Sequence, residues 1–329
     1  MKRSRVQSLL ILLLAFLLAG TFLSGCAESG AKKNNADGEN KKTTAIKTIR
    51  IGYQKNGPLV ILKSLGTLEK RLAQKGITVE WREFQAGPAL VEALNAGSID
   101  FGRTGDSPPI FAQAADAPFV YIAAGKPKFN GSAILVQKDS PIKSLSDLKG
   151  KKVGFAKGSS SHYLLIKGLE KAGINYIDIT PAFLAPGDGR VAFEKGNIDA
   201  WVVWDPFTSS AEVNAGARML VNGEGLTTDR DFFLASRDFA KHKEIIADIV
   251  EEIKNSSEWA NTHHTELVDL LSPILKIDKE SLEIAVKRRV YGVDEMNSQI
   301  IKEQQEIADT FYNLKIIPKK IDIKEVLNN

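Results

Sequence analysis

Cysteine and histidine are scarce in this 329-residue chain, which holds one cysteine and four histidines. The single cysteine, Cys26, excludes an internal disulfide and any zinc site built from cysteines. No His-Glu-x-x-His motif is present, and the neighbours His263 and His264 would point about 100° apart on a helix, a poor arrangement for holding one metal ion. The sequence therefore predicts no metal site, and no motif in it requires a cofactor.

The motifs of common enzymes are missing as well. The chain contains neither the Gly-x-Ser-x-Gly turn of serine hydrolases nor a phosphate-binding Walker loop. Residues 187–192 do fit the glycine pattern of dinucleotide-binding proteins, with Asp205 near the expected acidic position. An internal repeat of the chain aligns this segment with residues 86–89, which form an ordinary loop entering a helix. The sequence thus favours a binding protein over an enzyme.

Charge of one sign is in small excess, because Lys and Arg number 44 against 40 Asp and Glu, a formal charge of +4. Three of the cations, Lys2, Arg3 and Arg5, lie in the first 25 residues. The remainder gives no electrostatic case for a nucleic-acid partner, and we expect none. Hydrophobic residues make up 43%, enough for a real core, and the length indicates about two domains at roughly 150 residues each.

An apolar run, Leu9–Ala19, follows the N-terminal cations. It is shorter than the roughly 20 apolar residues of a membrane-spanning helix, so residues 1–25 are predicted to be a signal peptide. The sequence Leu23-Ser24-Gly25-Cys26 resembles the lipobox of bacterial lipoproteins, in which the cysteine is lipidated, with palmitate for example, and becomes the mature N-terminus. The alternative is an ordinary signal peptide with an incidental thiol. We expect export and anchoring by Cys26 to the outer face of the cell membrane.

Residues 26–47 are polar and charged, with almost no large apolar side chains. Such a segment cannot bury enough apolar surface to compensate the entropy lost on ordering, so we predict a flexible tether. Beyond it, β-rich runs at Thr48–Tyr53, Ile77–Trp81 and Ile99–Phe101 alternate with helical spacing. Strands that alternate with helices pair in parallel, which predicts an α/β fold.

The same order of elements recurs after about 100 residues, and the clearest match sets Gly97–Asp100 against Gly196–Asp199. Two copies of one unit predict two similar lobes. Beyond Phe239 the pattern is helical alone, so we expect the tail to return to the first lobe. The expected boundaries give lobe 1 as residues 48–137 and 232–329, and lobe 2 as residues 138–231. Two crossings make a hinge, with the ligand in the cleft between the lobes.

A glycine and three serines open a helix at Gly158–Leu165. The first turn of a helix offers unpaired backbone amides and the positive end of the macrodipole, and the hydroxyls add further donors. These features predict an anion site built from neutral donors, in which Ser159, Ser160, Ser161 and His162 lie near the ligand. The alternative is plain N-capping, for which one serine is enough.

Polar residues also end the predicted strands of both lobes. Thr104, Gly105 and Ser107 are candidate donors, whereas the nearby Asp106 is interpreted as a helix cap, since a carboxylate would repel an anion without a proton. Trp204 either covers the apolar part of a ligand or packs between the lobes. The candidate ligand-binding residues are Gln54, Thr104, Gly105, Ser107, Ser159, Ser160, Ser161, His162 and Trp204.

Segments 104–115, 51–55 and 203–207 together resemble the aliphatic-sulfonate-binding proteins of ABC importers, and the similarity extends over about residues 48–325. The Thr-Gly-Asp-x-Pro-Pro stretch that begins at Thr104 is the most specific part. The resemblance implies a two-lobed type II periplasmic-binding-protein fold without catalytic activity. It also implies a monomer that delivers an alkanesulfonate to a membrane permease driven by an ATPase, for sulfur acquisition.

Relatives with the same fold leave the ligand open. Taurine, nitrate and pyrimidine-precursor receptors are alternatives on this scaffold, and the competing class is an enzyme like the related pyrimidine synthases. Such an enzyme would need a reactive Lys or His in the cleft, where His162 is the candidate that the sequence places.

Overall fold

The structure is a computed structural model that describes residues 46–328. The predicted signal peptide, the lipidation site Cys26 and nearly all of the predicted tether lie outside the described residues. Within residues 46–328, no helix is both long enough and apolar enough to cross a membrane.

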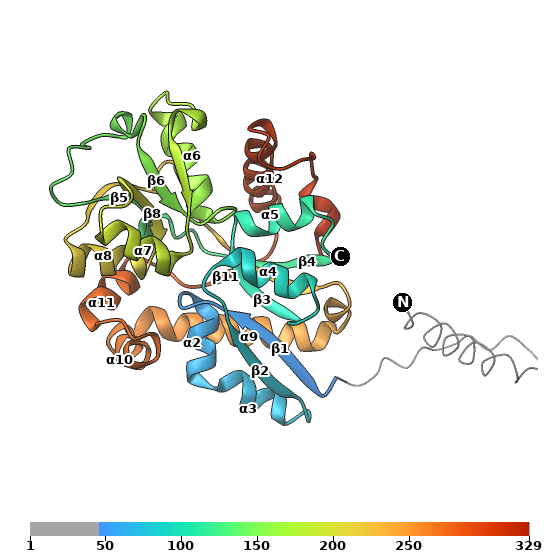
Figure 1. Ribbon diagram of the computed structural model, residues 1–329. Coiled ribbons are helices and arrows are strands. Elements are labelled where there is room, and N and C mark those ends of the chain that lie inside the picture. Colours follow the sequence, from blue (N-terminus) through green and yellow to red (C-terminus); the bar gives the residue numbers. More distant parts are fainter. Residues whose placement is uncertain (1–45, 329) are drawn as a thin grey trace, which may run out of the picture. The chain divides into compact units, whose positions relative to one another are not determined.

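Six strands form the first sheet, in the order β11-β4-β10-β3-β1-β2 (Figure 1). β1 pairs in parallel with β2 and β3, whereas β10 runs antiparallel to β3 and β4. The three strands predicted at the start of the fold are therefore present and parallel. Their bounds are β1 Thr48–Tyr53, β2 Thr78–Glu83, β3 Phe101–Gly105, β4 Phe119–Gly125, β10 Asp231–Ser236 and β11 Val293–Asp294.

Five strands form the second sheet, in the order β7-β6-β8-β5-β9. β6 pairs in parallel with β7 and β8, and β5 runs antiparallel to β8 and β9. The bounds are β5 Ser132–Val136, β6 Lys152–Phe155, β7 Thr180–Phe183, β8 Ala200–Trp204 and β9 Arg218–Asn222.

The repeat seen in the sequence has a structural counterpart. The order β2-β1-β3 matches β7-β6-β8, and both sets are parallel. The aspartate of each repeat makes the same hydrogen bond, since Asp100 accepts from the Arg50 amide and Asp199 accepts from the Lys152 amide, each at 2.8 Å. In the first lobe this bond joins the residue before β3 to β1, and in the second lobe it joins the residue before β8 to β6.

The lobe boundaries differ from the expected ones. The strand β5 ends at Val136, just before the boundary expected at residue 137, but it belongs to the second sheet. β5 pairs with β8 along one edge and with β9 along the other, so both of its edges are occupied by strands of the second sheet. The chain therefore crosses between the sheets in residues 126–131 and returns in residues 223–230.

Helices cover both faces of each sheet (Figure 1). Several begin with proline at the first or second position, where the missing amide costs no helical hydrogen bond. The bounds are α2 Pro58–Leu65, α3 Thr67–Ala73, α4 Gly87–Asn95, α5 Ser107–Ala114, α6 Ser160–Lys171, α7 Pro186–Glu194, α8 Phe207–Ala215, α9 Lys243–Thr262, α10 His264–Leu275, α11 Lys279–Lys287 and α12 Ser298–Asn313.

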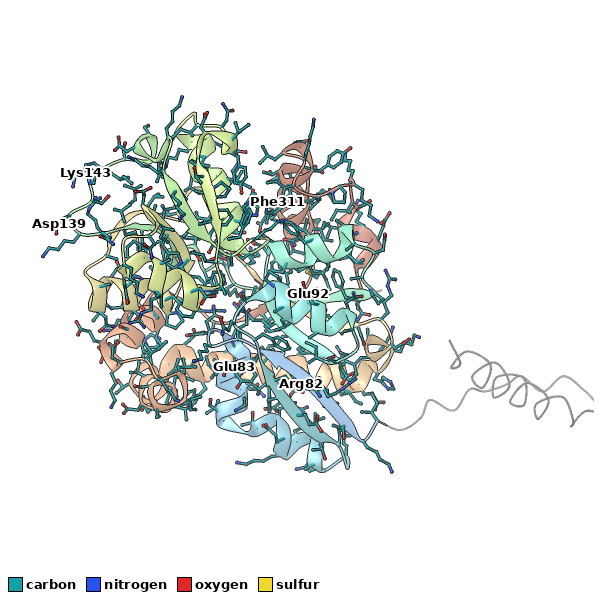
Figure 2. The ribbon with its side chains drawn as sticks, viewed as in Figure 1. Arg82, Glu83, Glu92, Asp139, Lys143 and Phe311 are labelled. Atoms are coloured by element: carbon teal, nitrogen blue, oxygen red, sulfur yellow. The ribbon has the colours of Figure 1, made fainter. Side chains whose placement is uncertain are left out.

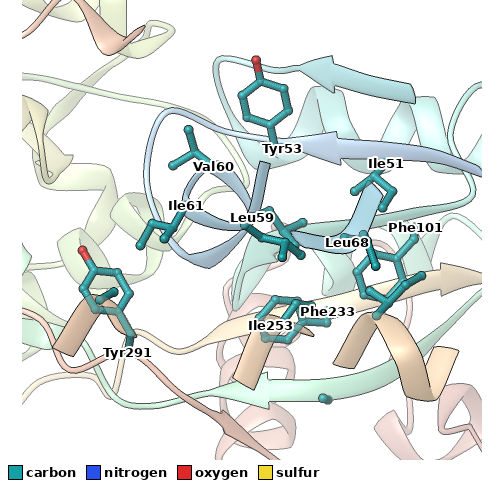
Figure 3. Packing of buried hydrophobic residues seen from close by; sticks show 14 of the residues in the cluster. Ile51, Tyr53, Leu59, Val60, Ile61, Leu68, Phe101, Phe233, Ile253 and Tyr291 are labelled. Carbon is teal, nitrogen blue, oxygen red and sulfur yellow. The ribbon is translucent and has the colours of Figure 1, made fainter. Parts of the chain in front are cut away.

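Two hydrophobic clusters cover the two faces of the first sheet. One combines β1 and β3 with α2, α3, α9, α10 and α11, and Figure 3 shows its centre around Leu59, Phe101 and Phe233. The other places α4, α5 and α12 on the opposite face. The second sheet is likewise covered by α6 on one face and by α7 and α8 on the other.

The helical tail holds the two lobes together as well as covering the first. α10 and α11 bury Leu271 and Val286 in the core of the first sheet. On the other side, the Asn214 side chain of α8 donates to Asp278 at 2.9 Å, and Arg288 lies 2.7 Å from Glu212 of α8. The pair α10–α11 therefore contacts both lobes beside the two crossings, and the tail does more than return to lobe 1.

Candidate functional site

A cavity with an empty volume of about 290 Å³ lies where the two sheets face each other, and we call it the head cavity. It is bounded by the carboxyl ends of β1, β3 and β8 and by the start of α6. Six predicted site residues contribute to it. The lining residues are Gln54, Asn56, Gly87, Arg103, Thr104, Gly105, Pro108, Lys128, Ser159, Ser160, Trp204 and Asp229.

The start of α6 brings hydrogen-bond donors to this cavity. Ser159 is the N-cap residue in extended conformation, but its hydroxyl donates to the Ala156 carbonyl at 2.7 Å and caps no helix amide. The first amides of a helix have no intrahelical acceptor, so those of Ser160 and Ser161 remain for other partners. The alternative of plain N-capping by Ser159 is therefore not what the structure shows.

The two lobes touch at Gly105. A Cβ atom added to this residue would lie 2.1 Å from the Ser160 hydroxyl oxygen, so this hydroxyl would have to turn away to make room for it. A similar contact exists at Gly87, where an added Cβ would lie 2.0 Å from the Thr104 hydroxyl. Thr104 is fully buried and its hydroxyl has no hydrogen-bond partner within residues 46–328, which leaves it available inside the site.

Three predicted site residues do not line the head cavity. Ser107 is buried in α5 and donates its hydroxyl to Asp106 at 2.9 Å. Ser161 and His162 follow Ser160 on α6, and each step along a helix turns the side chain by about 100°. Both side chains are buried, and the Ser161 hydroxyl, like that of Thr104, has no hydrogen-bond partner among the described residues. None of the three borders the head cavity, and their contact with the ligand stays a prediction.

His162 instead belongs to an aromatic cluster that joins the lobes. Its ring is 4.9 Å from that of Phe155 and 5.3 Å from that of Phe311, which is labelled on α12 in Figure 2. The Gly158 amide donates to Nδ1, and Nε2 lies 3.1 Å from the Tyr176 hydroxyl. Burial, and then the charge of a nearby lysine, lower the pKa of His162 to about 3, so the imidazole is neutral. These contacts give His162 a packing role.

Charged residues that the sequence analysis did not predict also border the head cavity, next to the neutral donors. Arg103 is buried within β3, and its guanidinium donates to the Asn56 side chain at 2.9 Å and pairs with Asp231. Lys128 is in the first crossing and Asp229 in the second, and they pair at 2.5 Å. An arginine inside an otherwise apolar strand is a signal that could have been noticed, but nothing local marks a pair 101 residues apart.

Together these groups form a buried ion-paired set at the hinge. Asp231 pairs with Arg103 and Arg289 and lies 3.7 Å from Lys128, which in turn pairs with Asp229. Burial raises the pKa of Asp231, but the charges of Arg103, Arg289 and Lys128 outweigh burial and lower it below its ordinary value. The set holds three cations and two carboxylates, and Arg103 and Lys128 are the cations in it that border the head cavity.

Asp106 lies outside these ion pairs. It is buried and accepts from the Ser107 hydroxyl, and one of its oxygens has no partner in the described part of the chain. Burial, and then the charge of Asp229, raise the pKa of Asp106 to about 6. Burial also raises the pKa of Asp205 to about 6, and Asp205 accepts from the Ser209 amide of α8 at 2.9 Å. Asp205 thus binds an amide in the first turn of α8, whereas the Asp106 side chain caps no amide of α5, contrary to its interpretation as a helix cap.

Residues 72–266 match the NMT1/THI5-like family. The chain belongs to this family. A family relative from Escherichia coli (strain K12), named a putative aliphatic sulfonates-binding protein, is 41% identical over 280 residues, which cover 84% of this chain and 87% of the relative. A protein of the same name from Bacillus subtilis (strain 168) is 37% identical over 325 residues, which cover 97% and 94%.

Two crystal structures extend the comparison within the family. The periplasmic aliphatic sulphonate binding protein SsuA from Escherichia coli is 40% identical, with a TM-score of 0.79 over 86% of this chain and 92% of that one. The alkanesulfonate-binding protein SsuA from Xanthomonas axonopodis pv. citri, bound to MOPS, is 37% identical, with a TM-score of 0.83 over 86% and 99%. The predicted family resemblance and the two-lobed binding-protein fold are confirmed.

Proposed function

We propose that this protein is the extracytoplasmic receptor of an ABC importer and binds aliphatic sulfonates in the head cavity. This proposal rests on the head cavity, which is lined by Thr104, Gly105 and Ser160, with their amides and the hydroxyls of the threonine and the serine. The buried cation Lys128 borders the same cavity. The sulfonate-binding names of the relatives support the same ligand class.

The chemistry of the head group fits the site. A sulfonate is ionised at every physiological pH and offers three acceptor oxygens but no proton. Backbone amides and hydroxyls can satisfy these oxygens, and charge-assisted bonds of this kind are stronger than neutral ones. Lys128 lines the cavity and supplies the cation that neutral donors lack, so the site combines both kinds of donor.

The proposal also covers how the protein is attached to the membrane. The sequence at Leu23–Cys26 supports lipidation of Cys26, which would tether the receptor beside its permease and ATPase. Metabolic labelling with a palmitate analogue should mark the wild-type protein and spare Cys26→Ser. Release of both proteins into the medium without label would count against the anchor. We also propose a monomer, and we propose that it has no catalytic activity. Lys128, the lysine that lines the head cavity, is engaged in an ion pair with Asp229, and no histidine borders the cavity in the described part of the chain.

Titration calorimetry with ethanesulfonate tests the main proposal. We expect a dissociation constant in the micromolar range or tighter, about −8 kcal/mol or better. Parallel titrations with taurine, nitrate and a pyrimidine precursor provide the comparison. Heat with one of those three ligands, and none with any alkanesulfonate, would replace the proposed ligand class while leaving the receptor function in place.

A further inference from the structure

Asp106 differs from the other buried acids near the hinge, because its carboxylate is only partly paired. It is 1% exposed and caps no amide of α5, and its Oδ1 accepts a hydrogen bond from the Ser107 hydroxyl at 2.9 Å. Its other carboxylate oxygen, Oδ2, has no partner among residues 46–328. Buried polar groups are ordinarily paired, so an unpaired oxygen at this position needs an explanation.

Asp106 lies directly behind the wall of the head cavity. It follows Thr104 and Gly105, which line the cavity from lobe 1. The Ser160 hydroxyl reaches across from lobe 2 and occupies the space beside Gly105. From α12, the Gln304 side chain donates to the Asp106 carbonyl at 2.5 Å and holds this segment in place. The carboxylate is therefore fixed at the contact between the two lobes.

The charges of the cavity wall reach this carboxylate. Burial raises the pKa of Asp106 to about 6, and the negative charge of Asp229 adds to this rise, whereas the positive charge of Lys128 opposes it. Burial also raises the pKa of Tyr121 in β4 and of Tyr163 in α6, which both feel the charge of Asp106, so these phenols are neutral. An anion in the head cavity brings a further negative charge to the side on which Asp229 already acts.

Ser160 connects Asp106 to the ligand. It lines the head cavity, and its hydroxyl lies beside the Asp106 carboxylate. A hydroxyl has one hydrogen, so it donates either to this carboxylate or to a ligand oxygen, but not to both. A protonated Asp106 would instead donate its own hydrogen to the Ser160 oxygen. The hydrogen of Ser160 would then be free for the ligand.

We propose that Asp106 takes up a proton from solvent when the receptor binds its anion, and that this proton turns the Ser160 hydroxyl toward the ligand. The proton bonds to Oδ2, the oxygen without a partner, and returns to solvent when the ligand leaves. No other covalent bond forms or breaks. Asp106 is thus a positioning residue that acts through Ser160. This inference rests on the proposed function, because it takes the anion to lie in the head cavity.

The proposal predicts tighter binding at lower pH. Above the pKa of Asp106, which is about 6, the free protein must gain a proton in order to bind, and this step becomes less favourable as the pH rises. Ethanesulfonate affinity should therefore fall by up to about tenfold per pH unit between about pH 6.5 and pH 8. The ligand cannot cause this trend, because a sulfonate has no proton to lose in that range.

Titration calorimetry in several buffers counts the protons. The observed heat of binding includes the ionisation heat of the buffer, so its slope against that heat gives the number of protons taken up per ligand. Bis-tris, imidazole and Tris are suitable, because sulfonate buffers would compete for the site. At pH 7 about nine-tenths of Asp106 is ionised before binding. If binding shifts its ionisation constant tenfold or more, the uptake is about 0.4–0.9 proton per ethanesulfonate.

Variants assign the proton to its residue. Asp106→Asn keeps the shape of the side chain without its charge, so uptake should fall to about zero and binding at pH 8 should be tighter than in the wild type. Asp106→Ser is a second neutral replacement with the same expected proton count. Asp205→Asn is the matched control, because burial raises the pKa of Asp205 to about 6 as well, although Asp205 does not border the head cavity. It should keep the wild-type uptake.

The role of Ser160 has its own readout. In the Ser160→Ala background there is no hydroxyl to turn, so Asp106→Asn should improve binding at pH 8 by a smaller factor than it does in the wild type. An equal factor in both backgrounds would show that Asp106 acts by its charge alone and would refute the positioning role.

The remaining outcomes separate the inference from the proposed function. Binding of ethanesulfonate without proton uptake refutes the inference and leaves the proposed function intact. Uptake that persists in the two Asp106 variants also refutes it, and its loss in Asp205→Asn would assign the proton to that carboxylate instead. Failure of the wild-type protein to bind any sulfonate removes the proposed function and the inference together.

Discussion

Replacement of Lys128 by methionine tests whether the buried positive charge at the hinge recruits the anion. In the native set, the cations Arg103, Lys128 and Arg289 face the carboxylates Asp229 and Asp231. Lys128→Met removes one buried positive charge and one donor but keeps a side chain of similar length. Hydrogen bonds to charged groups contribute about 1.5–3 kcal/mol, so ethanesulfonate affinity should fall by roughly 10- to 150-fold.

A matched control lies two residues away. Lys126 belongs to the same crossing and pairs with Asp294, but it is largely exposed and does not border the head cavity. Lys126→Met should leave the affinity within about twofold of the wild-type value, since exposed ion pairs contribute about 0–1 kcal/mol. Calorimetry at constant ionic strength gives the affinities, and circular dichroism verifies that both variants are folded.

The double variant Lys128→Met/Asp229→Asn separates charge from direct contact. Lys128→Met alone leaves Asp229 buried with only the Ser132 hydroxyl, and an unpaired buried carboxylate is strongly destabilising. The double variant removes that carboxylate and restores one excess positive charge on Arg103 and Arg289. We expect its affinity to lie between those of Lys128→Met and the wild type. The reasoning is refuted if Lys128→Met binds like the wild type, or if Lys126→Met loses as much.

Four other changes give distinct readouts. Gly105→Ala should displace the Ser160 hydroxyl from its present position, because the added Cβ would lie 2.1 Å from its oxygen. We expect a loss of about 1–3 kcal/mol in ethanesulfonate binding by calorimetry, and unchanged binding would show that this hydroxyl is not needed where it lies. Ser160→Ala should weaken ethanesulfonate binding by about 1–3 kcal/mol in calorimetry, whereas unchanged binding would mean that α6 contributes only amides. His162→Ala should destabilise the protein by about 2–5 kcal/mol in denaturant unfolding and change sulfonate affinity little; a large affinity loss would return His162 to the site. Asp106→Asn should raise the free energy of unfolding by up to about 3 kcal/mol at pH 8, because the pKa of Asp106 is raised to about 6 in the folded protein. This gain should shrink as the pH falls from 6 to 4, where Asp106 becomes protonated in the wild-type protein. A gain that does not depend on pH would contradict the raised pKa of Asp106.

The sequence predicted those parts of the site that local patterns mark. Ser159 and Ser160 are recognisable because a glycine and serines follow a strand and precede a helix. Trp204 is recognisable because the repeat places it at the carboxyl end of its strand, as the structure confirms. The repeat itself was visible because each Gly-x-Ile-Asp segment must present its aspartate to the amide of a neighbouring strand. The first two features are marked by residues next to them, and the third is visible because it recurs, although its hydrogen bonds join residues that are 50 and 47 positions apart.

Other features depend on contacts between distant parts of the chain. Lys128 and Asp229 resemble ordinary loop residues, and only the two crossings bring them together. The packing of α10 and α11 beside α2 is likewise not specified by the apolar periodicity of these helices. His162 shows a different limit, because its ring packs against Phe155 and Phe311 and does not border the head cavity. Amides and side chains of one helix start can point in different directions, and a sequence pattern does not distinguish them.

The position of the buried charge links binding to closure. A ligand shifts a conformational equilibrium only by the difference between its affinities for the two states. The ends of β3 and the start of α6 belong to different sheets, so an anion can reach Gly105 and Ser160 together only when the lobes are closed. Lys128 and Asp229 belong to the two segments about which the lobes must turn. On the proposed function, an anion held by Lys128 acts at the hinge, and closure of the lobes supplies its remaining donors.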